Sequence, residues 1–313
     1  MTPLDGLDFG RPVAPGGYAW WYMDALSDDG LHGITVIAFL GSVFSPWYAL
    51  ARRRGLLADP LNHAAVNVAL YGTKRRWAMT ERPRRAVQRD AQHLSIGPSS
   101  LEWDGTALMI RINEVAAPIP SRLRGTLRVL PAALNRRAFH LDPRGCHRWS
   151  PLAAVARVEV ELERPALRWS GAAYFDTNEG DAPLERDFVE WDWCRAPGPD
   201  GTAILYEALR RDGSRRCLAL QTSPSGEVAE VPAPEPVALP PTRIWRMPRR
   251  TRSESEARLA GTLEDTPFYA RSVLSTRLLG MERMAVHESL SLDRFRMPIV
   301  QAMLPFRVPR ARR

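Results

Sequence analysis

The feature of this chain that most limits its fold is an alternation of apolar and polar side chains with a period of two. The clearest case is Arg157–Glu163, RVEVELE, in which three aliphatic residues share one face of an extended chain and four charged residues share the other. Tyr18–Asp24 and Val66–Leu70 show the same period. Because a period of two places one face of each strand on a core, the sequence predicts half-buried antiparallel strands.

Turn signals between these segments support the same class. Asp104-Gly105 separates SSLEW from TALMIRIN, and Asp212-Gly213 separates ILYEALRR from SRRCLAL. An Asp-Gly pair between apolar segments is a strong hairpin signal, because glycine accepts a positive φ. Helical patterns are short and confined to Ser45–Arg54 and Ser253–Leu259. We therefore predict an all-β protein of antiparallel sheets, closed into barrels or folded into sandwiches, with few short helices.

The length of 313 residues predicts two folded units. We place the boundary between residues 143 and 144, giving units 1–143 and 144–313, because LDPRG interrupts the strand pattern there. Val231–Pro241, VPAPEPVALPP, is expected to be a proline-rich extended loop inside the second unit, with a linker as the alternative.

One uncharged segment, Gly33–Ala51, approaches the roughly 20 residues that a membrane-spanning helix needs. It begins with the β-prone ITVIAF and then contains glycine, serine and proline, so we interpret it as a buried strand followed by a loop, and a membrane span is the less favoured alternative. The N-terminus lacks a basic region followed by an apolar stretch, so no signal peptide is expected. Any contact with a membrane is therefore expected to be peripheral.

Charge and cysteine content exclude several classes. The net charge is +8, but no RNP, zinc-knuckle or helix-turn-helix signature accompanies it, so nucleic acid is not expected as a partner. Cys146, Cys194 and Cys217 have no CxxC spacing, which fits neither a disulfide framework nor a zinc site and favours a reducing, cytosolic setting. The chain contains no GxGxxG, P-loop, GxSxG or HExxH, and its histidines are scattered. We expect neither a cofactor nor a metal.

A compact group of chemically active residues occurs around GCHRWSP, residues 145–151, and Trp169–Trp193. In a strand, Tyr174 and Asp176 share one face, and His147 and Trp149 form a second pair of the same spacing. From the residues alone, Asp176 fits a turn aspartate at least as well as a catalytic acid. Likewise, both aromatic residues fit core packing and His147 fits a loop histidine.

GCHRWSP, AAYFDTNEG and FVEWDW resemble motifs of the carotenoid 1,2-hydratases, or hydroxyneurosporene synthases, of purple photosynthetic bacteria. NHAAVNVALYG, RWAMTER and the N-terminal segment that begins GGYAWWYMDALSDDG match the same family in the same order, so the resemblance covers roughly residues 16 to 300. It implies two tandem lipocalin-like β units. It also implies that water is added, without a cofactor, across the terminal C1=C2 bond of an acyclic carotene such as neurosporene or lycopene. The family's catalytic acid is an aspartate in this motif, and Asp176 matches it.

The implied reaction sets requirements on these residues. An isolated alkene is a very weak base, so Asp176 must be neutral, and burial must raise its pKa above the usual value of about 3.9. Protonation at C2 leaves a tertiary cation at C1, for which Trp149 and Tyr174 are the candidate stabilising rings. His147 either accepts a proton from the attacking water or orients Asp176. The rival interpretations are a carrier of a hydrophobic ligand without catalysis, and a hydrolase that uses Asp176 and His147 on water.

A carotene resides in lipid, so the implied enzyme would make peripheral contact with a bilayer on the cytoplasmic side of the intracytoplasmic membrane. The arginines near the C-terminus could attract anionic headgroups, with a solvated tail as the alternative. They are Arg307, Arg310, Arg312 and Arg313. Two acids after the motif, Glu190 and Asp192, are expected either to be solvated or to support the site.

Overall fold

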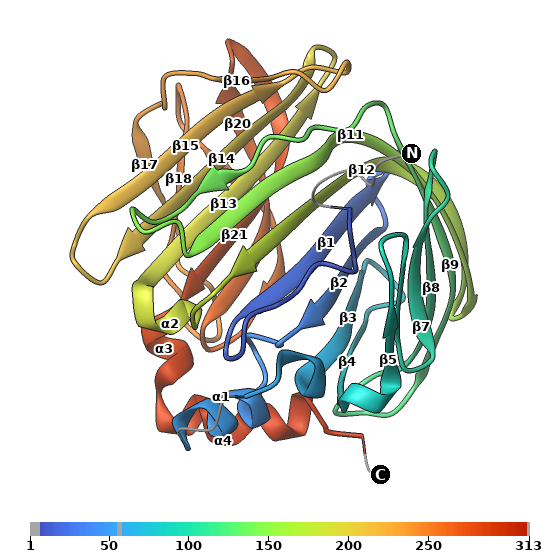
Figure 1. Cartoon of the computed structure of the whole chain (residues 1–313). Coiled ribbons are helices and arrows are strands. Elements are labelled where there is room, and N and C mark those ends of the chain that lie inside the picture. Colours follow the sequence, from blue (N-terminus) through green and yellow to red (C-terminus); the bar gives the residue numbers. More distant parts are fainter. Residues whose placement is uncertain (1–6, 55–57, 312–313) are drawn as a thin grey trace. The chain divides into compact units, whose positions relative to one another are not determined.

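The computed structural model describes residues 7–54 and 58–311, and antiparallel β-strands dominate it (Figure 1). This confirms the all-β class predicted from the period-two alternation. By its internal contacts the chain divides into two compact units, which are described separately. Unit 1 comprises Met1–Pro183 and Ala302–Arg313, and unit 2 comprises Leu184–Gln301. Arg312 and Arg313 of the predicted basic tail lie outside the described residues.

Among the described residues, unit 1 contains a twelve-stranded sheet in the order β4-β3-β2-β1-β12-β11-β9-β8-β7-β6-β5, with β10 paired to β11. Its strands are β1 Tyr18–Ser27, β2 Gly33–Leu40, β3 Ala64–Tyr71, β4 Arg76–Arg82, β5 Val87–Arg89, β6 His93–Ile96, β7 Ser99–Trp103, β8 Leu108–Val115, β9 Arg122–Pro131, β10 Phe139–His140, β11 His147–Arg164 and β12 Ala166–Gly180.

The sheet of unit 1 curls until β4 approaches β8, so that it is nearly closed. Arg82 of β4 donates a hydrogen bond to Glu114 of β8 at 2.7 Å, and Ser99 of β7 donates to the same carboxyl at 2.6 Å. Burial raises the pKa of Glu114, while Arg82 and Ser99 oppose that rise. A buried ion pair thus joins two strands that do not pair through their backbones.

The two faces of β1 and β12 carry different side chains. Alternate residues such as Trp21 and Phe175 belong to the hydrophobic core of unit 1. The residues between them lie on the other face, and there Tyr22 of β1 lies opposite Asp176 of β12. Every residue of β1 except Leu26 is buried, so this second face is also largely shielded from water. The chemically active residues lie on this second face.

Short helices complete unit 1: α1 Pro46–Arg53, η1 Pro60–His63, η2 Arg84–Ala86 and the last turns of α4 Pro298–Arg307. Ser45 caps α1 by accepting hydrogen bonds from two backbone N–H groups. Helix α1 confirms the helical segment predicted at Ser45–Arg54. Residues 33–51 form β2, a short loop and part of α1, so the prediction of a buried strand followed by a loop is confirmed. No helix within residues 7–54 and 58–311 has the length and apolar character needed to cross a bilayer.

Within the described chain, unit 2 has a seven-stranded sheet in the order β16-β15-β14-β13-β21-β20-β19 and a separate hairpin of β17 and β18. The strands are β13 Phe188–Gly198, β14 Gly201–Arg210, β15 Arg215–Thr222, β16 Val228–Glu230, β17 Pro236–Leu239, β18 Arg249–Arg252, β19 Arg258–Asp265, β20 Tyr269–Leu278 and β21 Met281–Ser291, and the helices are α2 Leu184–Asp187 and α3 Leu292–Arg296.

Two local predictions in unit 2 need correction. The helix expected at Ser253–Leu259 is wrong, because these residues form a loop that enters β19 in an extended conformation. The proline-rich segment Val231–Pro241 is not a loop throughout, because Pro236–Leu239 forms strand β17 with β18. Proline tolerates such a hairpin edge, where its missing N–H leaves no gap in a central ladder.

The predicted boundary between residues 143 and 144 falls just before β11. The pairing runs across that point, because β11 pairs with β9 and β12 pairs with β1. The division into compact units therefore falls after β12, between Pro183 and Leu184. Long-range strand pairing, which a local interruption in the pattern does not reveal, sets this position.

Candidate functional site

Asp176 lies inside β12, opposite Tyr22 of β1, and is only 4% exposed. The alternative of a turn aspartate is wrong, because the strand continues to Gly180. On its other side Asp176 faces β11, where the register shifts between Ser150 and Ala153. Two residues of β11, Pro151 and Leu152, therefore lie opposite the single residue Asp176. Such a β-bulge redirects side chains and is common beside functional sites. The proline of GCHRWSP thus sits in the bulge next to the candidate acid.

Three of the four predicted residues meet at one oxygen atom. Trp149 Nε1 donates a hydrogen bond to Asp176 Oδ2 at 2.9 Å, and the Tyr174 hydroxyl donates to the same oxygen at 2.9 Å. Both donors are fully buried and uncharged. Tyr174 reaches the acid because it precedes it by two residues, whereas Trp149 reaches it from β11 across the strand pair.

His147 begins β11 rather than lying in a loop. Its Nδ1 lies 2.9 Å from the Tyr18 hydroxyl, and the two rings stack with centroids 5.9 Å apart. Gly180 lies between them in the sheet, paired with His147 on one side and with Tyr18 on the other. A Cβ atom on Gly180 would lie 2.3 Å from the Tyr18 ring, so only glycine leaves room for that ring. The sequence pattern did not single out Tyr18 as a partner of His147.

Aromatic rings surround these groups. Tyr22 contacts the Tyr174 ring edge-on at 6.2 Å, and Phe139 packs against Trp149 at 5.7 Å. Trp20 stacks on Tyr18 at 4.9 Å. Trp21 belongs to the hydrophobic core of unit 1, while Trp20 and Tyr22 lie on the same face as the acid. Such rings present negative π-faces that can stabilise a cation without reacting with it.

Asp24 is a second buried carboxyl on this face, fully shielded from solvent and opposite Tyr174. It was visible in the sequence as the last member of the Tyr18–Asp24 alternation, but nothing in that pattern distinguished it from a solvated acid. Burial on both faces of β1 is the property that the sequence did not reveal.

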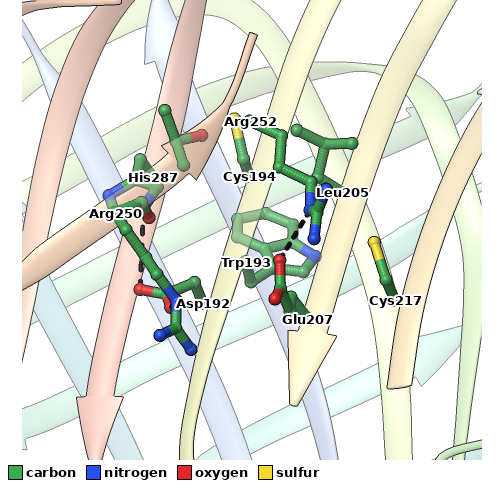
Figure 2. Close-up of a pocket in the computed structure, with 10 residues that line it drawn as sticks. Asp192, Trp193, Cys194, Leu205, Glu207, Cys217, Arg250, Arg252 and His287 are labelled. Atoms are coloured by element: carbon green, nitrogen blue, oxygen red, sulfur yellow. Dashed lines mark hydrogen bonds and ion pairs between the residues drawn. The ribbon is translucent and has the colours of Figure 1, made fainter. Parts of the chain in front are cut away.

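A small cavity lies within unit 2 (Figure 2). Its volume of about 10 Å³ is about that needed to hold one water molecule and is far too small for a polyene. It is lined by Asp192, Trp193, Cys194, Leu205, Glu207, Cys217, Arg250, Thr251, Arg252 and His287. In the described part of the chain, no cluster of three or more His, Cys, Asp or Glu side chains could hold a metal ion.

Asp192 in this cavity is ion-paired rather than solvated, so that earlier alternative is wrong. Arg250 Nε lies 3.0 Å from its Oδ2, and Ser289 donates a hydrogen bond to its Oδ1 at 2.5 Å. Burial raises the pKa of Asp192 to about 7, although Ser289 and Arg250 favour the carboxylate. His287 donates from Nε2 to the Arg250 carbonyl at 2.7 Å, and burial lowers its pKa to about 4.

Comparison with solved structures defines the fold class. A candidate AttH protein from Nitrosomonas europaea matches 93% of this chain and 98% of its own with a TM-score of 0.63 at 15% identity. A kievitone hydratase from Nectria haematococca matches 94% of this chain and 100% of its own with a TM-score of 0.52 at 10% identity. At these identities the likeness concerns the fold alone. The chain has the lipocalin-like β architecture that the family resemblance implied, with a nearly closed sheet and a second large sheet.

Comparison of sequences defines the family. The model of the family "Carotenoid hydratase CrtC" matches residues 36–313. An acyclic carotenoid 1,2-hydratase of Thiocapsa roseopersicina is 59% identical over 98% of this chain and 76% of its own length. The proteins of the same name from Rubrivivax gelatinosus and Rhodobacter capsulatus are 49% and 40% identical over 96% and 88% of this chain and 75% and 97% of their own lengths. The chain belongs to the carotenoid hydratase CrtC family.

Proposed function

We propose that this protein is an acyclic carotenoid 1,2-hydratase, a hydro-lyase that adds water to the terminal C1=C2 bond of an acyclic carotene. The observation that carries the proposal is Asp176, a buried carboxyl hydrogen-bonded by two uncharged aromatic donors. Membership of the family and the ordered motifs support the same reaction.

In the first step, neutral Asp176 transfers its proton to C2 of the alkene. Both hydrogen bonds from Trp149 and Tyr174 go to Oδ2, so the acidic proton is assigned to Oδ1. The π bond supplies the electron pair of the new C2–H bond and leaves a tertiary cation at C1. As the carboxylate forms, the hydrogen bonds from these two donors become stronger, because hydrogen bonds to a charged acceptor are stronger than those to a neutral one.

The cation at C1 is held by aromatic faces rather than by a nucleophile. Tyr174 and Tyr22 contact each other edge-on, and Trp149 packs against Phe139 on the same side of the sheet. A cation over such a ring is stabilised by about 0.5–2 kcal/mol for each ring. The ring nearest the cation cannot trap it in a covalent bond as readily as a free carboxylate would.

In the second step, water forms the C1–O bond and loses a proton. His147 accepts this proton through its link with Tyr18, and the proton returns to the Asp176 carboxylate to close the cycle. The tautomer of His147 sets which ring nitrogen accepts. Alternatively, His147 orients Asp176 and the water returns its proton to the carboxylate directly. In both cases the atoms balance, and no oxidant or reductant is needed.

The substrate also implies contact with lipid. We propose that the protein binds the cytoplasmic face of a membrane peripherally, since a carotene has to enter from the bilayer. The net charge of +8 supports attraction to anionic headgroups, and three free cysteines fit a reducing compartment.

Isotope labelling tests the reaction directly. Wild-type protein is incubated with lycopene or neurosporene in detergent, once in H₂¹⁸O and once in D₂O, and the products are analysed by mass spectrometry. We expect ¹⁸O in a tertiary hydroxyl at C1 and one deuterium at C2. A carrier would bind the carotene, shifting its visible absorption, and return it unlabelled. A hydrolase would leave it unchanged, and either result would refute the proposal.

A further inference from the structure

Helix α4 exposes an apolar stripe. Ile299, Met303 and Phe306 follow each other at helical spacing and are 63%, 37% and 77% exposed. The other face of the helix is already used, because Val300 and Leu304 are buried. A surface helix of a water-soluble domain normally presents charged or polar residues where this stripe lies, so the stripe indicates a partner.

The chain segment that contains the stripe is basic. From Arg294 to Ala311 the chain contains no aspartate or glutamate, and Arg296 is exposed just before the helix. Helix α1 is also free of acids and ends in exposed Arg53 and Arg54. The two helices meet, because Trp47 Nε1 of α1 donates a hydrogen bond to the Val308 carbonyl, just after α4, at 3.1 Å (Figure 1).

We infer that the α4 stripe, together with the arginines beside it, is the surface that docks on an anionic lipid bilayer. An apolar helix face flanked by arginine fits the boundary between acyl chains and negative headgroups, where the side chains leave water and the guanidinium groups stay in the headgroup layer. The inference specifies where the lipid contact proposed above takes place.

A second copy of the chain fits this surface less well. A two-fold contact would place identical patches against each other, which brings arginine onto arginine with no acid in either segment to compensate. An anionic bilayer supplies the missing negative charge and an apolar layer at once. A soluble phosphate would satisfy the arginines but would leave the stripe in water.

Carotene-free vesicles of phosphatidylcholine, with and without phosphatidylglycerol, test the inference by co-sedimentation with the full chain. We expect the wild type to bind anionic vesicles, and Phe306→Glu to weaken that binding at least about tenfold, because a large apolar side chain is replaced by a negative charge. Ile299→Glu is the second variant of the stripe. Ile119→Glu is the matched control, because Ile119 is 81% exposed but lies in the loop between β8 and β9.

The arginines give an independent readout. Arg53→Gln with Arg54→Gln should reduce binding to anionic vesicles several-fold and leave the weak binding to neutral vesicles unchanged. Wild-type protein that ignores both kinds of vesicle would overturn the inference, as would stripe variants that bind like Ile119→Glu. So would a wild-type dimer in sedimentation equilibrium that Phe306→Glu converts to a monomer. Because these vesicles contain no carotene, the outcome is independent of the labelling test of hydration.

Discussion

Asp176 of β12 and Asp192 of β13 are both aspartates on long strands and both are shielded from solvent, yet their neighbours differ. Oδ2 of Asp176 accepts hydrogen bonds from a tryptophan and a tyrosine, which carry no charge. Asp192 instead lies 3.0 Å from the Arg250 guanidinium. A full positive charge stabilises a carboxylate whether or not a reaction takes place, whereas neutral donors stabilise it only in proportion to the charge that develops. Both carboxyl groups are therefore buried. The charge of the hydrogen-bond or ion-pair partner distinguishes Asp176, the proposed acid, from Asp192, which is ion-paired.

The largest expected effect is on turnover. Asp176→Asn should lower kcat/KM for an acyclic carotene in detergent at least about 10³-fold, because an amide cannot supply the proton. Asp192→Asn, the matched control in unit 2, should stay within about threefold of wild type. Both variants should retain cooperative thermal unfolding. Loss of turnover in Asp192→Asn with turnover kept in Asp176→Asn would reverse the comparison.

The free energy of unfolding should depend more on the ion pair of Asp192 than turnover does. Above pH 7, where Asp192 is ionised, Arg250→Met leaves a buried carboxylate beside a neutral side chain. It should then lower the free energy of unfolding of unit 2 by about 2–3 kcal/mol, less than for a fully buried pair because 27% of the Arg250 side chain is exposed. Urea unfolding followed by tryptophan fluorescence measures this. An unchanged midpoint would show that the cation does not stabilise the carboxylate.

The pH dependence of stability should separate Asp192 from His287, two buried titrating groups of unit 2. The folded pKa of Asp192, about 7 against an ordinary 3.8, means that its contribution to stability falls as the pH rises through that interval. The folded pKa of His287, about 4 against 6.5, means that its contribution falls as the pH drops through that interval. Between about pH 4 and 6.5 the two trends oppose each other.

Replacing His287 by Gln removes one of these trends. The free energy of unfolding of His287→Gln should then decrease with rising pH between 4.5 and 6.5, by up to about 1 kcal/mol per pH unit. Urea titrations at three pH values measure the slope, and the double variant with Asp192→Asn should lose it. A slope equal to that of wild type would contradict the contribution assigned to His287, and a slope that persists in the double variant would contradict the one assigned to Asp192.

The smallest expected effect concerns the neutral donors. Trp149→Phe keeps an aromatic ring beside the acid but removes the N–H that reaches Oδ2, so kcat should fall about tenfold, the value of one hydrogen bond to a developing charge. Tyr174→Phe should act similarly. Trp193→Phe in unit 2 is the control, and it should leave kcat unchanged. If both Trp149→Phe and Tyr174→Phe kept full turnover, the charge of the donors would not matter, and the comparison between the two carboxyls would fail.

Local patterns predicted the strands and part of the site. The Asp-Gly pairs at residues 104–105 and 212–213 do connect β7 to β8 and β14 to β15, and both glycines have positive φ. Tyr174 and Asp176 share a face because neighbouring alternate residues in any strand do so. Helix α4 escaped detection, because Pro305 lies inside it and its apolar residues occur on both faces.

Contacts between distant strands were not predictable in this way. The hydrogen bond from Trp149 to Asp176 depends on the pairing of β11 with β12 and on the bulge at Pro151 and Leu152. Tyr18 and His147 are brought together only because β1 and β11 flank the same end of β12. Spacing within a segment carries no information about which strand becomes its neighbour.

The amino-acid sequence by itself determined the β class, the hairpin turns and the pairing of Tyr174 with Asp176 on one face, since each depends on backbone geometry over a few residues. Only the tertiary structure decided which carboxyl meets neutral donors and which meets arginine, and that strands on both sides of residue 143 join one sheet. Burial and partner charge are properties of packed surfaces, and those surfaces exist only after strands that are far apart in the chain have paired.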